Sequence, residues 1–147
     1  MNYKYFEISD IHEFLKFIDS NLKDIKYFHP HKFDYESVKS IIENKKEDIY
    51  LLFYERNMII GYGILRGWDE GYSIPSLGIL IDKSVRGSGY SRRILNILHE
   101  ISKSRFSDFI RLTVKTDNTI AINFYEKNGY EFKKYNKDSL EGFYKIN

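Results

Sequence analysis

Residues 81–91 of the chain read IDKSVRGSGYS, and the fold is worked out from this segment. An apolar stretch ends at Ile81, a turn with Gly87 and Gly89 follows, and an amphipathic pattern begins near Tyr90. We predict a strand, a turn and the start of a helix, whose free backbone N–H groups and dipole favour an anion such as pyrophosphate. The glycines would let the backbone approach a ligand closely. A turn that binds nothing explains these residues equally well.

Two other phosphate-binding motifs do not fit this segment. It lacks the Gly-Lys-Ser/Thr ending of a Walker A loop. The Rossmann pattern requires a third glycine where Tyr90, Ser91 and Arg92 stand, and an acidic residue on a following strand. Nucleotide-binding folds built on these motifs are therefore disfavoured.

Outward from this segment, apolar alternation predicts strands and apolar residues three or four apart predict helices. The predicted strands are 3–8, 49–54, 58–65, 73–81, 110–114, 130–135 and 142–146, and the predicted helices are 11–18, one starting at 34, 89–103 and 118–128. Asp10 and Glu13 resemble a capping box for the first helix, and Gly129 suits a left-handed cap for the last.

This order predicts an α+β fold with one central, twisted, mixed and mostly antiparallel sheet. We expect six or seven strands flanked by about four helices. A strand, helix and strand between residues 76 and 114 imply a right-handed parallel crossover within the sheet. Nothing divides the chain, so residues 1–147 are predicted to form a single domain.

Composition narrows the class of protein. The chain has 147 residues, 42% hydrophobic and 30% charged, which is ordinary for a globular domain. A net charge of +2 with interspersed Lys and Glu gives no basic face for nucleic acid. The absence of cysteine excludes disulfides, a thiolate nucleophile and cysteine zinc sites. No apolar stretch is long enough to span a bilayer, so we expect a cytoplasmic protein without a metal, nucleic-acid or membrane partner.

Residues 118–132, NTIAINFYEKNGYEF, carry the second informative pattern. On a helix, Asn118, Ala121 and Tyr125 share one face. Taken alone, Tyr125 is better explained as a core aromatic. The segment resembles, at every anchor, the Asn-x-x-Ala-x-x-x-Tyr-x-x-x-Gly-Phe/Tyr pattern of the GNAT superfamily of N-acetyltransferases. The 81–91 segment is similar to that family's acyl-coenzyme A loop, with Ser91 in place of the usual Gly or Ala.

The resemblance implies a GNAT-like fold and acetyl-CoA as the acetyl donor. It implies that backbone N–H groups hold the coenzyme pyrophosphate at Arg86, Gly87, Ser88, Gly89, Tyr90 and Ser91. It also implies that the pantetheine arm lies along Ile79, Leu80 and Ile81 and beside Asn118 and Ala121. Tyr125 would protonate the departing thiolate, and a backbone N–H in the 77–80 stretch would stabilise the oxyanion.

The general base is harder to assign. Many relatives of this type carry a Glu on the strand before the phosphate loop, whereas here residues 75–78 read PSLG. We therefore propose Asp69 and Glu70 as base or ammonium anchor, Ser76 as a proton relay through water, and Trp68 with Tyr72 as acceptor-binding aromatics. The alternative is a solvated hairpin tip without a role in catalysis.

The sequence thus predicts direct acetyl transfer from acetyl-CoA to a primary amine of a small molecule in a ternary complex. The GWDEGYSIPSLG segment at 67–78 is similar to a GNAT subgroup associated with surface-polysaccharide synthesis, which suggests an amino-sugar nucleotide as acceptor. A peptide or protein N-acetyltransferase and a non-catalytic acyl-CoA sensor are the alternatives. The protein is expected to be a monomer or a homodimer.

Overall fold

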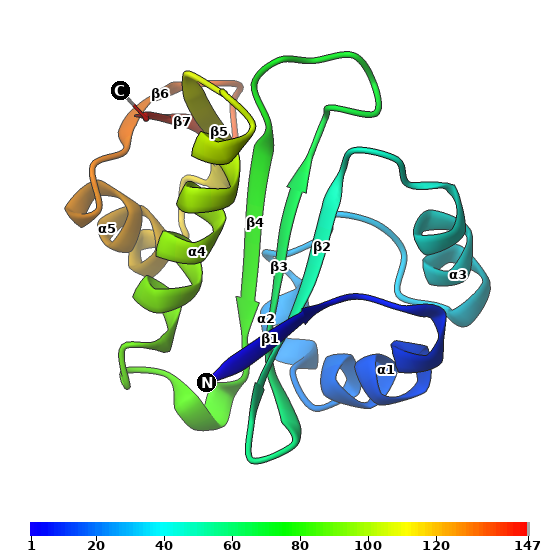
Figure 1. Cartoon of the computed structure of the whole chain (residues 1–147). Helices are drawn as coiled ribbons and strands as arrows, with labels where there is room; N and C mark the ends of the chain where they lie inside the picture. Colours follow the sequence, from blue (N-terminus) through cyan, green and yellow to red (C-terminus); the bar gives the residue numbers. More distant parts are fainter. Residues whose placement is uncertain (147) are drawn as a thin grey trace.

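The computed structural model describes residues 1–146, which form one seven-stranded mixed sheet with five α-helices (Figure 1). The strands are β1 Asn2–Tyr5, β2 Ile49–Glu55, β3 Met58–Arg66, β4 Ser76–Ile81, β5 Phe109–Lys115, β6 Glu131–Lys134 and β7 Ser139–Lys145. The helices are α1 Ile11–Asp19, α2 Leu22–Ile25, α3 Tyr35–Asn44, α4 Tyr90–Ser104 and α5 Thr119–Lys127, with 3-10 turns η1 Ile8–Asp10 and η2 Lys83–Val85. The predicted α+β class and mostly antiparallel sheet are confirmed.

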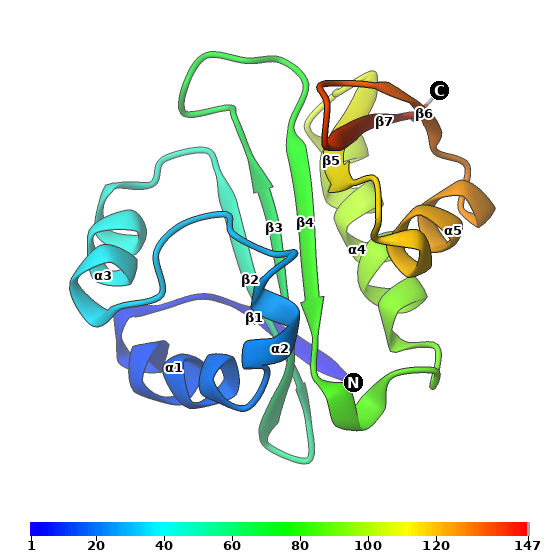
Figure 2. The same cartoon turned by 180° about the vertical axis from the view of Figure 1, so that it is seen from behind.

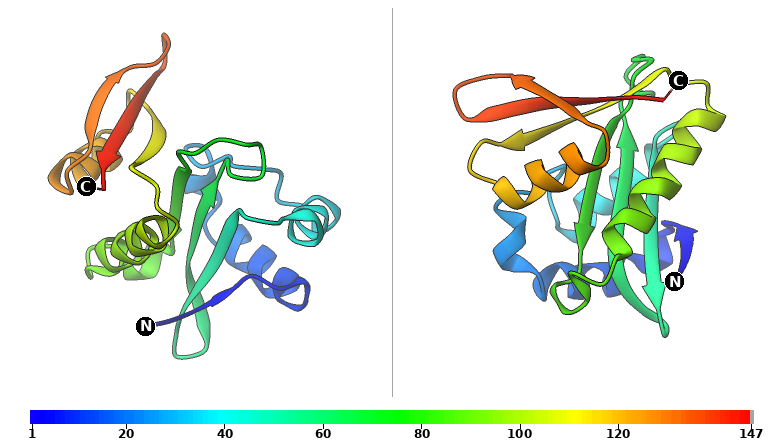
Figure 3. Two further views of the ribbon diagram at one scale, coloured as in Figure 1. Left: turned by 45° about the horizontal axis from the view of Figure 1, so that its top comes forward. Right: turned by 90° about the vertical axis from the view of Figure 1, so that its left-hand side faces the viewer.

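The sheet separates two helical layers (Figures 2 and 3). Helices α1, α2 and α3 lie on one side, which we call the α1 face, and α4 and α5 lie on the other, the α4 face. Each face has its own core, because side chains alternate along a strand. On β2, Leu51 and Phe53 pack into the α4-face core, whereas Tyr50 and Leu52 pack into the α1-face core.

Strands β4 and β5 are parallel neighbours that are paired in register at one residue position only. All six residues of β4 pair with β3 in antiparallel register. Only Ser76, the first of them, pairs with β5, opposite Arg111. The strands diverge beyond this pair, so the sheet opens into a gap that widens toward Ile81, where the turn to α4 begins.

Three sequence predictions need correction. The first strand ends at Tyr5 instead of residue 8, because Glu7 already starts the turn η1. Asp10 does not cap α1 with its side chain. Its carboxylate instead accepts from the Glu7 backbone N–H at 2.8 Å and from the Lys4 ammonium at 3.0 Å. The short helix α2 was not predicted, because a single turn is too short to show helical periodicity.

Two glycines of β3 let α4 pack closely on the sheet. A methyl group added at Gly61 would lie 2.8 Å from Cδ1 of Ile94, and one at Gly63 would lie 3.2 Å from Cδ1 of Leu98. Ile94 and Leu98 are completely buried. The small residues therefore set the distance between α4 and β3, and with it the position of the loop that precedes α4.

We expect Gly61→Val to lower the free energy of unfolding by about 1–3 kcal/mol, because its methyl groups force Ile94 out of its packed position. Urea unfolding followed by circular dichroism measures the change. Met58→Val is the matched control, since it places the same side chain on the same strand at a position that is 70% exposed. An equal loss in both variants would contradict the close-packing explanation.

Candidate active site

The loop between β4 and α4 presents free backbone N–H groups. Gly87 and Gly89 adopt positive φ values of 76° and 86°, and a Cβ added at either would have no atom within 4 Å. Arg93 is the first residue of α4 whose N–H donates back, to the Gly89 carbonyl at 3.3 Å. The preceding N–H groups of the first turn have no intrahelical partner and lie at the positive end of the helix dipole. This geometry suits an anionic group.

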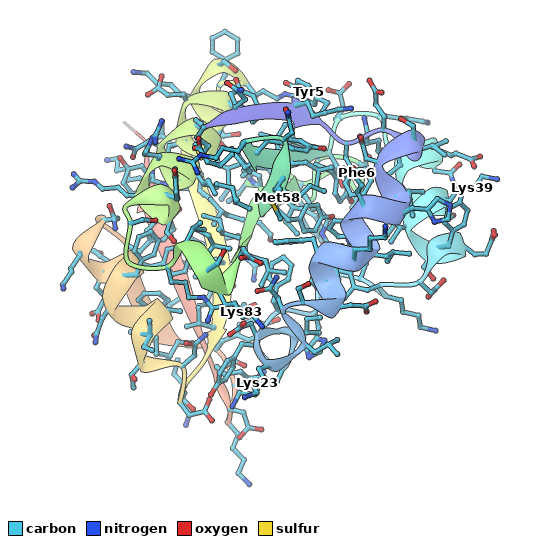
Figure 4. All side chains as sticks on the ribbon, turned by 90° about the horizontal axis from the view of Figure 1, so that it is seen from below. Tyr5, Phe6, Lys23, Lys39, Met58 and Lys83 are labelled. Atoms are coloured by element: carbon cyan, nitrogen blue, oxygen red, sulfur yellow. The ribbon has the colours of Figure 1, made fainter. Side chains whose placement is uncertain are left out.

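A buried asparagine joins this loop to the α1 face. Asn21 is 1% exposed; its Nδ2 donates to Asp82 Oδ1 at 2.8 Å and its Oδ1 accepts from the Lys83 N–H at 2.9 Å. The Arg86 guanidinium pairs with Asp24 of α2. Figure 4 looks onto this end of the molecule, with Lys23 of α2 and Lys83 labelled on the two joined segments. Helix α2 and the start of the loop are therefore held as one unit.

The gap between β4 and β5 exposes polar backbone. The Pro75 carbonyl accepts from the Arg111 N–H of β5, whereas the Asp82 N–H donates in the other direction, to Ile60. Backbone groups point to alternate edges of a strand, so the N–H groups of Ile79 and Ile81 face β5. Since β5 has moved away there, these N–H groups point into the gap.

Helix α5 lies on the α4 face of the sheet. Asn118 is its N-cap residue, and Tyr125 lies within the helix. The Asn118 side chain caps the helix by accepting from the Ala121 N–H at 3.3 Å. Tyr125 is 8% exposed, and its ring packs edge-on against Phe124 and Tyr130. Burial raises the pKa of its phenol well above the usual value.

The Tyr125 hydroxyl is free to meet a ligand. It donates to and accepts from no group within residues 1–146, although every fully buried side-chain oxygen and nitrogen in this range has a partner. The hydroxyl must therefore reach solvent at its tip. A protonated phenol with an accessible O–H is suited to giving up a proton.

A histidine supports the tyrosine cluster from α4. His99 Nε2 lies 2.9 Å from the Tyr130 hydroxyl, and its ring stacks on Tyr144 with centroids 4.2 Å apart. Burial lowers the pKa of His99 to about 4. The histidine is therefore neutral at physiological pH, and it fixes Tyr130 against Tyr125.

The structure gives two of the predicted acceptor residues, Asp69 and Trp68, other contacts. Asp69 accepts from the backbone N–H groups of residues 46–48, which hold its pKa below the usual range although burial opposes this. The Trp68 ring packs into the α4-face core under the Arg105 guanidinium, 4.9 Å away. Asp69 and Trp68 are thus structural. Glu70 and Tyr72 are exposed on the hairpin tip, and Tyr72 is 64% exposed.

Ser76 stands where the two central strands part, and its Oγ accepts from Arg111 Nη1 at 2.7 Å. Two residues further along β4, Gly78 leaves no room for a side chain. A Cβ there would lie 2.9 Å from Cγ1 of Ile64 and 3.1 Å from Cε1 of Phe28. Ile64 and Phe28 therefore leave no room on the α1 face for a carboxylate side chain at this position of β4.

An ion pair on the α1 face was not predicted. Arg111 donates through Nε and Nη2 to one carboxylate oxygen of Glu141 on β7, at 3.1 and 2.6 Å. The Glu141 side chain is only 14% exposed. The alternation of Arg111 with Ile110 and Leu112 indicated a polar strand face, but its partner depends on the β5–β7 register, which no local pattern reveals.

A cleft of about 430 Å³ opens near the wide end of the gap. It lies between the segment after α2 and the turns that follow β5 and β6. Its lining residues are Lys26, Tyr27, Lys115, Thr116, Asp117 and Asp138.

Among residues 1–146, no three His, Asp or Glu side chains gather as a metal site would require. Within the same range, no helix is both long and apolar enough to cross a bilayer.

Comparison with known proteins finds similarity over most of the chain. The model of the acetyltransferase (GNAT) family matches residues 10–130. A search of curated protein sequences finds no match. The PaiA N-acetyltransferase of Thermoplasma acidophilum, in complex with coenzyme A, is similar in structure, with a TM-score of 0.84, 15% identity and 98% of each chain covered.

Two further solved structures differ in their named acceptors. Spermidine N-acetyltransferase SpeG of Vibrio cholerae, an F149A mutant, has a TM-score of 0.80 and 14% identity, with 99% of this chain and 95% of that chain covered. The ribosomal-protein-S18-alanine N-acetyltransferase of Escherichia coli has a TM-score of 0.75 and 16% identity, with 99% and 93% covered. At these identities the likeness concerns the fold.

We expect His99 to make the protein less stable as the pH falls from about 6.5 to 4. In this range His99 is protonated in the unfolded chain and neutral in the folded chain. The free energy of unfolding therefore falls by up to about 3 kcal/mol. Urea unfolding across this range measures the slope. His99→Gln should flatten it and His12→Gln should not; an unchanged slope in His99→Gln would count against the assignment.

Proposed function

The chain belongs to the GNAT acetyltransferase family, and we propose that it transfers acetyl from acetyl-CoA to a primary amine of a small molecule. One observation carries the proposal. The gap between β4 and β5 runs from Ser76 to the loop before α4, and Tyr125 lies in the α4-face core, against which Ile79 and Ile81 of β4 also pack. Donor and acceptor can therefore meet in the gap from opposite faces of the sheet.

The residues present fit the coenzyme. Free N–H groups from the turn and the first turn of α4 suit its pyrophosphate, and the open space above Gly87 and Gly89 admits it. The unpaired N–H groups of Ile79 and Ile81 would bind the pantetheine amides. Leu80, which the sequence also suggested for this role, lies between them with its backbone groups facing β3 and its side chain in the α1-face core. Ala121 leaves room beside α5, and the free Nδ2 of Asn118 is an additional donor.

The coenzyme would supply acetyl as a thioester. The neutral amine would attack the carbonyl carbon, the C–S bond would break, and the proton that the nitrogen loses as the amide forms would pass to water. The Ile79 N–H, directed into the gap, would donate to the carbonyl oxygen as it gains negative charge. Tyr125 would give its proton to the thiolate sulfur. The phenol is protonated at neutral pH even at its ordinary pKa, so it holds the proton that this role uses, and burial raises its pKa further.

The acceptor would approach across the α1 face. The carboxylates of Asp117 and Asp138 on the rim of the cleft would pair with an ammonium group, in competition with the cations of Lys26 and Lys115 on the same rim. Neither Ser76 nor Gly78 supplies a base on β4, so we propose that the proton of the ammonium leaves through water on this open face. Ser76 remains a candidate to order that water, because its own O–H is free to donate.

The size of the cleft supports a small acceptor. About 430 Å³ lies within the range of small-molecule sites. An amino-sugar nucleotide is the candidate suggested by residues 67–78. The solved spermidine acetyltransferase, named for a small amine, is similar in fold to this chain. A peptide acceptor is the second candidate, since the S18-alanine acetyltransferase has the same fold. A non-catalytic acyl-CoA sensor would have no use for a free Tyr125 hydroxyl.

We expect Tyr125→Phe to lower kcat about 100-fold or more, because a general acid contributes at least this much. Thiol release from acetyl-CoA is measured with amino-sugar nucleotides, polyamines, aminoglycosides, amino acids and short peptides. Calorimetric titration should show unchanged coenzyme A binding. Tyr144→Phe, which removes a hydroxyl from the same aromatic cluster, serves as control. Binding of coenzyme A without thiol release by any amine would favour the sensor.

We expect Gly89→Ala to raise the KM for acetyl-CoA about tenfold or more, because its methyl group enters the space proposed for the phosphates. Gly71→Ala is a close control. Gly71 also has a positive φ, 92°, and open space around its Cβ, but it lies at the β3–β4 tip. Both variants should lose about 1 kcal/mol of stability from backbone strain. Equal KM values for the two variants would place the coenzyme elsewhere.

A further inference from the structure

Arg66 is a half-buried cation on the α1 face without an anionic partner. It ends β3 and pairs in register with Ser76 of β4. Tyr62 and Ile64, the preceding residues of the same side of β3, pack into the α1-face core, so Arg66 points toward this face as well. Within residues 1–146, no carboxylate lies within the 4.0 Å of an ion pair from its guanidinium.

The polar groups around Arg66 include the Tyr50 hydroxyl and the His31 ring. The carboxylates of Asp48 and Asp69 also act on Tyr50, but they accept from the backbone N–H groups of residues 46–48, 67 and 69 and form no ion pair with Arg66. His31 is held in place by Tyr62, whose hydroxyl lies 2.8 Å from Nε2. Arg111, on the other side of Ser76, already has its partner in Glu141. The excess positive charge beside Ser76 therefore belongs to Arg66.

A half-buried charge is stabilised by an anion at hydrogen-bonding distance, and a guanidinium matches a carboxylate or phosphate with two parallel hydrogen bonds. Within residues 1–146, no carboxylate lies at that distance from Arg66. Ser76, opposite Arg66, is also the point from which the gap opens. Two residues of β4, about 7 Å, separate Ser76 from Gly78 beside the proposed site of transfer.

We propose that Arg66 binds a carboxylate or phosphate group of the acceptor, so that the enzyme selects primary amines that also carry an anion. This inference rests on the proposed acetyl transfer to a small amine and specifies its substrate class. The amine enters the gap while the anion reaches back across Ser76 to the guanidinium. Arg66 acts as a specificity-determining residue and takes no part in breaking the thioester.

Binding of matched amine pairs tests the inference without turnover. The dissociation constants of glucosamine and glucosamine 6-phosphate, and of phenethylamine and phenylalanine, are measured by calorimetry on the protein saturated with coenzyme A. The first pair tests a phosphate and the second a carboxylate. In the wild type, the anionic member of at least one pair should bind about tenfold or more tightly than the neutral one.

Arg66→Gln should abolish this preference while leaving the weaker binding of the neutral amine unchanged, which also shows that the variant is folded. Arg66→Lys should restore part of it, since lysine keeps the charge and loses the planar fork. Arg56→Gln removes a positive charge from the turn between β2 and β3, at the opposite end of β3 from Arg66. This control variant should keep the full preference for the anionic amine.

The inference is overturned if neither pair shows a preference for the anionic member, and this includes the case in which none of the four amines binds. It is also overturned if Arg66→Gln and Arg56→Gln have the same effect on the preference. The two proposals fail separately. A preference that depends on Arg66, without thiol release from acetyl-CoA by any amine, supports the anion site and refutes acetyl transfer. Thiol release by neutral and anionic amines at equal KM does the reverse.

Discussion

The loss of pairing between β4 and β5 after a single residue pair is the constraint on which the site depends. A continuous parallel ladder would satisfy the N–H groups of Ile79 and Ile81 within the sheet. Because β5 leaves after Arg111, these groups remain available at the bottom of an opening in the sheet. Buried backbone groups without a partner are costly, so the fold retains donors that a bound ligand can satisfy.

The elements around this opening are held from both sides. On the α4 face, Gly61 and Gly63 bring α4 close to β3, and thereby fix the helix end that the loop from β4 enters. On the α1 face, Phe28 fills the space above Gly78. The two cores meet only through the sheet, so each face can bind its own ligand while the gap connects them.

The two segments expected to bind the coenzyme were predicted from sequence as a loop and a helix, whereas the contacts of the residues expected to bind the acceptor were not, for a physical reason. The loop at 81–91 and the helix that begins after Asn118 are local structures, determined by glycines, caps and apolar spacing within about fifteen residues. The ion pair of Arg111 with Glu141 depends on strand register over 30 residues of sequence. Asp69 appeared to be a free carboxylate because its donors, the N–H groups of residues 46–48, come from a distant turn. All seven strands were expected, and the missed helix, α2, is a single turn.

The buried Asn21 has a consequence for engineering. Its amide binds both Asp82 and Lys83, so the α1–α2 junction cannot move without disturbing the turn that leads into α4. Residues 17–26 are therefore coupled to the turn between β4 and α4. A chimera that replaces the segment 27–33 should keep 17–26, so that the new segment begins from an anchored boundary.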